Sequence, residues 1–359
     1  MKRDPQKLLI ITTILICIGI VMVYSSSSPY AYDRHYDSAY YLKRHLIHFL
    51  IGLALALFVK KTGYKNIRKH SKVLLALAIL SLVTVLAPGI GREAGGARRW
   101  VRLGFLGFQP SEFAGLFLIV YLADALERKQ SYLKSFLYGF MPPFIVTGIV
   151  VLLVLLQPDL GSAFTIFVVA LTMIFIAGIN IKYFLPFVIS AVPAFYFLVL
   201  RVPYRLRRIV GYLDPWGDAQ NSGFQIAQSF LALGAGGVFG VGLGASRQKL
   251  FYLPQSHTDF IFSIIGEELG LIGTLGVVIL FVAFVWLGIK IAIKTHDLFG
   301  GFLAMGITLS IGLKALINIA VSTGAIPTKG LPLPFVSYGG TALIANMAAV
   351  ALLLSVQEG

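Results

Sequence analysis

Long apolar runs separated by short polar connections dominate the pattern along the chain. Each run is long enough to cross roughly 30 Å of hydrocarbon as a helix. The expected spans are residues 8–24, 43–59, 73–88, 111–126, 136–156, 162–179, 183–200, 260–289, 299–322 and 339–356. The pattern predicts an all-α polytopic membrane protein with ten transmembrane helices. We expect residues 1–359 to form a single integral membrane domain with both termini on one side.

One connection, from Arg201 to Asp259, is far longer than the others and lies between the seventh and eighth spans. Residues 225–233 have the pattern of a short amphipathic helix, and glycine is frequent between Gly234 and Gly244. Long ordered loops are usually functional. The glycine-rich part does not follow a strand and lacks the lysine spacing of a nucleotide-binding loop. Close backbone packing or a re-entrant turn is therefore favoured there.

Composition agrees with this class, because 57% of the residues are hydrophobic and the mean hydropathy is +0.84. A net charge of +15 suggests nucleic acid in a soluble protein. Here the basic residues lie in short loops between apolar runs, which indicates membrane orientation and anionic lipid head groups instead. No nucleic-acid partner is expected. The one cysteine, Cys17, excludes an intrachain disulfide and a cysteine-based metal site.

The distribution of cations predicts the orientation. The N-terminal tail, residues 60–72, Lys182 and Lys290 fall on one face, which the positive-inside rule makes cytoplasmic. Asp124 and Glu127 near this face are interpreted as solvated helix ends. The opposite face also keeps many cations, namely Arg92, Arg98, Arg99, Arg102, Arg201, Arg205, Arg207, Arg208, Arg247, Lys249 and Lys329. Two interpretations remain open: they bind an anion such as a pyrophosphate, or they contact lipid phosphates or partner acids.

Acidic residues mark the stretch where this outer region enters the eighth span. Asp259 lies at the start of the span, and Glu267 and Glu268 lie inside it. Carboxylates at that depth are costly unless they are paired. Lys314 lies at a matching depth in the ninth span, so we expect it to pair with one of these glutamates as a structural charge pair. Two interpretations of Asp259 remain open: it takes part in chemistry, or it only caps the helix.

Six motifs, in order, resemble the SEDS family (shape, elongation, division and sporulation). They are Gly96-Ala-Arg-Arg-Trp-Val-Arg-Leu-Gly104 with Phe108-Gln-Pro-Ser-Glu-Phe113, Gln157-Pro-Asp-Leu-Gly-Ser162, Leu253-Pro-Gln-Ser-His-Thr-Asp-Phe-Ile-Phe262 with Gly266-Glu-Glu-Leu-Gly270, and Pro327-Thr-Lys-Gly-Leu-Pro-Leu-Pro-Phe-Val-Ser-Tyr-Gly-Gly340. The resemblance spans nearly the whole chain. It is closest to RodA/FtsW-type peptidoglycan glycosyltransferases, with RodA slightly preferred.

The resemblance implies lipid II as substrate, a class B penicillin-binding protein as transpeptidase partner, and the bacterial inner membrane with the active site facing outward. The acid of the His-Thr-Asp motif, regarded as catalytic in the family, is Asp259, and the lysine of the Thr-Lys-Gly-Leu motif is Lys329. Two positions depart from the family pattern. Gln255 replaces a glutamate, and Gly115 stands where a lysine is common three residues after Glu112.

The chemistry of lipid II suits a single displacement. Its sugar is α-linked to pyrophosphate, so inversion at an acceptor hydroxyl gives a β-1,4 bond and releases undecaprenyl pyrophosphate. The step needs a base, for which we assign Asp259, and positive charge on the leaving group. The charge would come from some of Arg98, Arg99, Arg102, Arg207, Arg208, Lys249 and Lys329. A divalent cation could assist, but the sequence contains no dedicated ligand cluster. We expect Asp259 at the mouth of an outward-opening cavity flanked by residues 98–100 and Lys329.

The full set of expected substrate-binding residues is Arg98, Arg99, Trp100, Gln109, Glu112, Asp159, His257, Thr258, Lys329 and Ser337. Alternatives remain for several of them. Gln109 and Glu112 fit a helix cap, Asp159 fits the cap of the following helix, and Trp100 fits an interfacial anchor. His257 is better interpreted as an interfacial hydrogen-bonding residue than as a metal ligand.

Two other functions stay open, a lipid II transporter and a scaffold that only recruits the transpeptidase. A transporter favours broken helices near the midplane and polar groups that reach both faces. This chain instead concentrates its unusual polar residues toward the outer leaflet, which favours the polymerase.

Overall fold

A computed structural model describes residues 3–358 except 88–90, 95–96, 104–105, 134, 187–188, 190–192, 194–195, 219–220 and 222. The helices are α1 (Arg3–His35), α2 (Tyr40–Thr62), α3 (Tyr64–Lys69), α4 (Ser71–Leu86), α5 (Pro110–Arg128), α6 (Met141–Leu155), α7 (Leu160–Ile176), α9 (Pro203–Leu213), α10 (Phe224–Gly236), α11 (Ile261–Lys294), α12 (Leu298–Ser322) and α13 (Gly340–Glu358). Short turns of tighter or wider helix are η1 (Gln130–Tyr132), η2 (Phe136–Phe140), η3 (Ile181–Phe184) and η4 (Tyr196–Leu200). The strands are β1 (Gly91–Ala94), β2 (Ala97–Leu103) and β3 (Leu106–Phe108).

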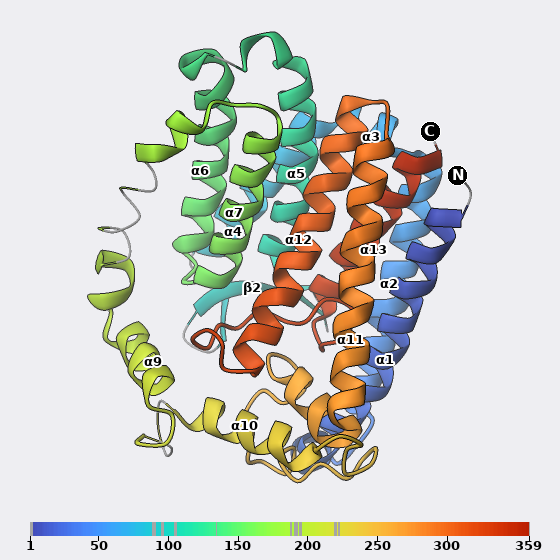
Figure 1. The fold of residues 1–359 in the computed structure, drawn as a ribbon, viewed down its shortest axis with the longest axis vertical. Helices are drawn as coiled ribbons and strands as arrows, with labels where there is room; N and C mark the ends of the chain where they lie inside the picture. Colours follow the sequence, from blue (N-terminus) through green and yellow to red (C-terminus); the bar gives the residue numbers. More distant parts are fainter. Residues whose placement is uncertain are drawn as a thin grey trace.

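The long helices form one bundle with both termini at the same end (Figure 1). Among the described residues, six helices are long and apolar enough to cross a membrane: α1, α2, α6 with η2, α11, α12 and α13. Shorter apolar helices are α4 and α7. Helix α5 runs beside them and carries four charged residues, which is why it does not count as a span by composition. The expected span at 183–200 lies partly outside the described residues.

Helix α1 is longer than its apolar run, which ends near Tyr24. It continues through four serines and Pro29 to His35. The serines do not end the helix because Ser26 and Ser27 donate their hydroxyl hydrogens to the carbonyls of Met22 and Val23 on the preceding turn. Their polar groups are thus satisfied inside the helix.

Two polar contacts set α1 against α11. Near the termini, Lys290 Nζ lies 3.0 Å from Asp4 Oδ1. At the opposite end, Ser25 Oγ donates to Glu268 at 2.7 Å. The two helices therefore run antiparallel with a fixed register.

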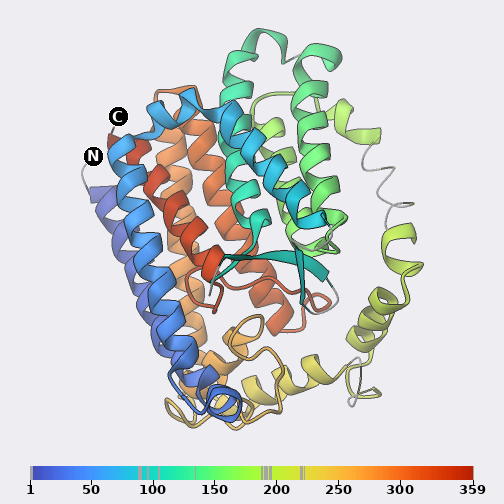
Figure 2. The same ribbon diagram turned by 180° about the vertical axis from the view of Figure 1, so that it is seen from behind.

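A small antiparallel sheet replaces the loop expected between α4 and α5. Its strand order is β1-β2-β3, with Gly91 opposite Val101 and Val101 opposite Phe108, and a bulge lies between Arg92 and Glu93. Figure 2 shows the sheet at the end of the bundle away from the termini. The all-α expectation therefore holds for the bundle but not for this connection.

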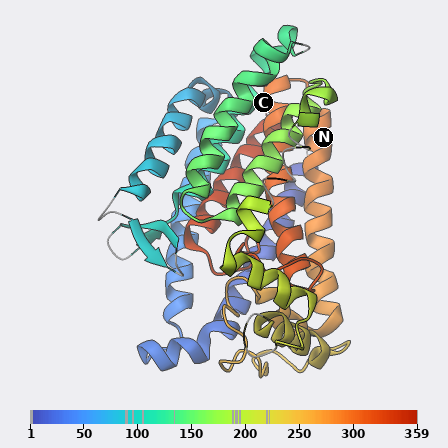
Figure 3. The same ribbon diagram turned by 90° about the vertical axis from the view of Figure 1, so that its left-hand side faces the viewer.

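The glycine-rich stretch after α10 packs backbone to backbone on α11, as expected. Helix α11 kinks at Gly270, whose φ is +66°. The kink frees the carbonyls of Glu267 and Glu268 to accept hydrogen bonds from the amides of Val241 (2.9 Å) and Gly242 (3.1 Å). A Cβ on Gly240 would clash with the carbonyl of Glu268. Helix α10 covers the expected amphipathic segment. Figure 3 shows this region below the bundle.

An ion network holds the other end of the bundle. Asp124 accepts hydrogen bonds from Arg68 (3.0 Å) and Ser71 (2.7 Å), and its carboxylate lies 2.9 Å from Arg128. Arg68 also lies 2.6 Å from Glu127. The interpretation of Asp124 and Glu127 as solvated helix ends is therefore wrong, because both pair with Arg68 of α3 and Asp124 also pairs with Arg128 on the next turn.

Candidate active site

Two segments far apart in the sequence meet at the start of α11. Residues 257–259 precede the helix, and residues 331–338 lie between α12 and α13. The amide of Tyr338 donates to the carbonyl of His257 at 2.9 Å. Ser337 Oγ donates to the carbonyl of Thr258 at 2.5 Å and accepts from the amide of Leu333 at 2.8 Å. Three predicted site residues, His257, Thr258 and Ser337, are therefore brought together.

Asp259 belongs to the same junction. Asn318 on α12 donates from its amide group to the carbonyls of Asp259 and Leu331, both at 2.8 Å. A Cβ on Gly330 would lie 3.1 Å from Asp259 Oδ2, so the backbone of this loop runs close beside the carboxylate. Sequence reasoning missed Asn318. The signal that could have identified it is a polar amide side chain inside an apolar span.

Lys329 lies next to Gly330 in this loop. Its Nζ is 4.2 Å from the ring centroid of Phe164 on α7, within the range of a cation–π contact. Burial lowers the pKa of Lys329 from its ordinary value of 10.5, because a desolvated ammonium is less stable than one in water. An anion placed beside it would stabilise the protonated ammonium.

His257 lies among tyrosines rather than charged groups. Its ring centroid is 4.9 Å from that of Tyr41, 5.7 Å from that of Tyr30 and 5.8 Å from that of Tyr338. Burial lowers the pKa of His257 to about 4, so the imidazole is neutral at physiological pH. Across the described part of the chain, no three His, Cys, Asp or Glu side chains are grouped so as to hold a metal ion.

Gln109 and Asp159 form a second polar cluster at the same end. Asp159 caps α7 by accepting from the amide and the hydroxyl of Ser162 at 3.0 and 2.9 Å. Gln109 Nε2 donates to Asp159 and to Ser111, both at 3.1 Å. The capping interpretation of Asp159 is confirmed, and Gln109 ties this cap to the start of α5.

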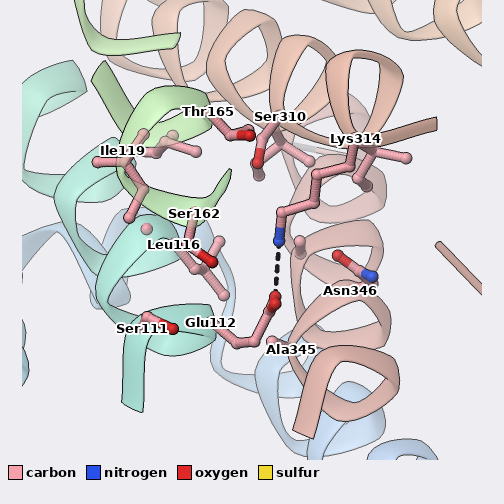
Figure 4. A pocket seen from close by; sticks show the side chains of 15 residues that line it. Ser111, Glu112, Leu116, Ile119, Ser162, Thr165, Ser310, Lys314, Ala345 and Asn346 are labelled. Carbon is pink, nitrogen blue, oxygen red and sulfur yellow. Dashed lines mark hydrogen bonds and ion pairs between the residues drawn. The ribbon is translucent and has the colours of Figure 1, made fainter. Parts of the chain in front are cut away.

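Glu112 faces a cavity between α5, α7, α12 and α13. Lys314 Nζ lies 2.6 Å from Glu112 Oε2 across it (Figure 4). The cavity measures about 30 Å³, which is room for about two water molecules. The predicted pairing of Lys314 with Glu267 or Glu268 is therefore wrong. Gly115 lines the same cavity, so the ammonium that meets Glu112 comes from α12 and not from the position three residues along α5.

Glu267 and Glu268 have partners of their own. Glu268 lies 2.8 Å from Lys249 Nζ, and both side chains are buried. Glu267 accepts from the hydroxyl of Ser246 and from the amide of Arg247. Lys249 is thus occupied in a structural pair and is removed from the candidates for leaving-group binding.

Strand β2 carries the remaining predicted residues. The ring of Trp100 packs close to Gly107 on the neighbouring strand. Arg99 has a buried Nε with no hydrogen-bond partner in the described structure. The side chains of Arg98, Arg102, Arg205 and Arg208 lie outside what the structure describes, and Arg207 is exposed. Asp259, Arg99 and Trp100 do not line the cavity beside Glu112, so the expected cavity mouth at Asp259 does not coincide with it.

This architecture defines a multi-pass membrane protein in which an acid before α11, Asp259, and the loop that carries Lys329 between α12 and α13 meet at one junction. Comparison with known proteins gives the family. The profile of the cell cycle proteins FtsW, RodA and SpoVE matches residues 6–359. The chain belongs to this family, the SEDS proteins.

Individual relatives match this chain along nearly its whole length. A probable peptidoglycan glycosyltransferase FtsW of Geobacter metallireducens is 46% identical over 99% of this chain and 95% of its own length. Stage V sporulation protein E of Bacillus subtilis is 44% identical over 99% of this chain and 98% of its own length. A chain of a peptidoglycan synthase complex superposes with a TM-score of 0.80 at 28% identity, covering 98% and 96%. RodA of Thermus thermophilus superposes with a TM-score of 0.73 at 27% identity, over 98% of this chain and 95% of its own. The higher identities carry division and sporulation names, so they do not support the slight preference for RodA.

Proposed function

We propose that this chain polymerises peptidoglycan glycan strands from lipid II, with Asp259 as the general base. The reaction transfers the disaccharide-peptide with inversion to a hydroxyl acceptor, forms a β-1,4 bond and releases undecaprenyl pyrophosphate. The relatives named as peptidoglycan glycosyltransferases, which match nearly the whole chain, support the reaction class.

Accessibility supports Asp259 over Glu112, Glu267 and Glu268. Glu112, Glu267 and Glu268 are 6%, 2% and 1% exposed and hold structural partners. Asp259 is only partly buried and lies at a junction of loops. A base must reach the acceptor hydroxyl within hydrogen-bonding distance, which a fully enclosed carboxylate cannot do. This difference carries the assignment.

The proposal also includes the membrane topology, the substrate contacts and the partner. Ten helices cross the bacterial inner membrane, both termini are cytoplasmic, and Asp259 faces outward as part of one integral domain. Lys329 and Arg99 bind the pyrophosphate, while Arg98, Trp100, Gln109, Glu112, Asp159, His257, Thr258 and Ser337 border the substrate. No resident metal is assigned. A class B penicillin-binding protein is the partner, by analogy with the synthase complex.

Substitution of Asp259 by asparagine tests the base. Asparagine keeps the shape and caps helices about as well as aspartate, but it cannot accept the proton. We expect unchanged folding and lipid II binding, with polymerisation reduced roughly 10²–10⁴-fold or more. The measurement is glycan product on a gel from purified protein and lipid II, with and without the transpeptidase. Normal product formation by Asp259→Asn would refute the assignment.

Substitution of Lys329 or Arg99 by glutamine tests the anion site. We expect weaker use of lipid II, seen as a raised KM, with little change in thermal stability. Lys182→Gln is the matched control, because it removes an exposed cation beyond the far end of α7. Equal KM values for Lys329→Gln, Arg99→Gln and the control would leave lipid anchoring as the explanation of the outer cations.

A further inference from the structure

Helix α9 has an apolar and a basic side. Leu206, Val210 and Leu213 recur at i, i+4 and i+7 and so occupy one face at about 100° per residue. The arginines occupy other positions around the helix. Arg205 and Arg208 lie three residues apart on a different face, Arg207 lies on the remaining side, and Arg201 precedes the helix. Cations therefore flank the apolar stripe on both sides.

The apolar side of α9 is not covered by the part of the chain that the structure describes. Val210 is 54% exposed, Leu213 is 74% exposed, and Trp216 just beyond the helix is 58% exposed. Tyr212, about 120° around the helix from the centre of this stripe, contacts the bundle, because its Oη donates to the carbonyl of Ala325 at 3.0 Å. Figures 1 and 2 show α9 set apart from α6 and α7, between the level of the sheet and that of α10.

The segment before α9 continues the same chemistry. Tyr196 and Phe197 of η4 are exposed. The guanidinium of Arg201 lies 5.3 Å from the ring centroid of Tyr196, and its Nε is 3.1 Å from the phenolic oxygen. Aromatic rings with a polar tip, arginines and exposed aliphatic side chains together are typical of the boundary between lipid and water.

We propose that α9 is an interfacial helix that docks on the outer-leaflet surface of the membrane. Its apolar face, with Trp216, enters the boundary between head groups and acyl chains, and its arginines bind the phosphates of anionic phospholipids. Charge complementarity selects this occupant, because an acidic soluble protein would match the arginines but leave the leucine and valine face uncovered. The inference does not depend on the polymerase reaction.

Site-directed spin labelling in liposomes tests the docking. The chain has one cysteine, so Cys17→Ser gives a background for single labels. Labels are placed at Leu213 on the apolar face, at Arg207 on its flank, and at Ile279, which is 64% exposed on the bundle surface of α11 and serves as the control for lipid contact. Collision rates with oxygen, which concentrates in lipid, and with a water-soluble nickel complex report the depth of each label.

We expect the label at 213 to favour oxygen, as the label at 279 does, and the label at 207 to favour nickel. Equal access of nickel to 207 and 213 would place α9 in water and overturn the proposal. Protection of 213 from both reagents would mean protein contact and would also overturn it. Melting temperatures of the labelled proteins show whether each remains folded.

A second arm tests the arginines without lipid II. Vesicles of phosphatidylcholine alone are compared with vesicles that contain phosphatidylglycerol. Each arginine at an anionic surface shifts the ratio of inserted to detached helix by about fivefold. We therefore expect the inserted fraction, read from the spectrum at 213, to rise with phosphatidylglycerol. Arg201→Gln should lower the ratio of inserted to detached helix about fivefold in the anionic vesicles and leave it unchanged in phosphatidylcholine. Equal insertion in both lipids would overturn the assignment of the arginines to lipid phosphates.

Discussion

Replacing Lys314 by glutamine tests whether its ion pair holds α12 against α5. The ammonium lies 2.6 Å from Glu112, and the two side chains are 13% and 3% exposed. Removing one partner of a buried pair costs about 3–5 kcal/mol because the other charge remains buried. The lower value is expected here, since the cavity beside the pair admits water. At about 2 °C per kcal/mol for a large domain, the melting temperature should fall by about 6 °C.

A second substitution should restore the pair from the other helix. Gly115 lies three residues after Glu112, on the same face of α5, and lines the same cavity. A Cβ there would lie 3.4 Å from Ile166, an ordinary contact, so a side chain fits. A lysine at this position can reach the carboxylate of Glu112. The double variant Gly115→Lys/Lys314→Gln should therefore recover most of the lost stability.

Thermal unfolding of the purified protein in detergent measures both effects, and glycan synthesis from lipid II follows function. Lys290→Gln is the control, because it breaks the pair with Asp4 at the other end of the bundle, where Gly115→Lys should give no rescue. An unchanged melting temperature for Lys314→Gln would refute the reasoning. So would a Gly115→Lys change that rescues both single variants equally.

Three further results are expected. If protonated Lys329 binds the pyrophosphate, activity should fall as pH rises through its lowered pKa, below 10.5, and Lys329→Arg should move this loss to higher pH in a pH–rate profile. Lys249→Met should lower the melting temperature more than the double change Lys249→Met/Glu268→Gln, since the single change strands a buried carboxylate. Gly240→Ala should destabilise by roughly 1–3 kcal/mol in the same melts, because its φ is +81° and the carbonyl of Glu268 occupies the space.

The sequence predicted the apolar helices well for a physical reason. In lipid every backbone group must be bonded within its own helix, so length and hydropathy locate most of the structure. The last turns of α1 were not predicted, because serine side chains usually compete with the backbone hydrogen bonds of a helix. Here the hydroxyls of Ser26 and Ser27 bond to carbonyls of the preceding turn, and the helix continues. The sheet at 91–108 was missed because hydropathy only marks this stretch as not a span. Its signal was the dipeptide Gly95-Gly96, which favours a two-residue hairpin turn.

The partner of Lys314 was predicted wrongly because depth along a helix does not give direction around it. Glu267, Glu268 and Lys314 lie at similar depths, but the glutamates turn toward α1 and residues 246–249. Lys314 turns toward α5. Which faces meet is decided by packing between helices, and one sequence contains little information on it. The meeting of residues 257–259 with 331–338 was likewise inferred from family motifs and not from periodicity.

The polar contacts between helices also fix the position of Asp259. Between apolar helices in lipid, packing alone leaves sliding along the axis weakly opposed, whereas one buried polar pair sets the register. Glu268, held by Ser25 and Lys249, lies nine residues after Asp259 and about 10 Å along α11 from its first residue, Ile261. Asn318 on α12 holds the Asp259 carbonyl from the other side. The proposed base is therefore placed by α1, by the turn after α10 and by α12 together, so a substitution at Glu268 should reduce activity through position while the carboxylate of Asp259 remains intact.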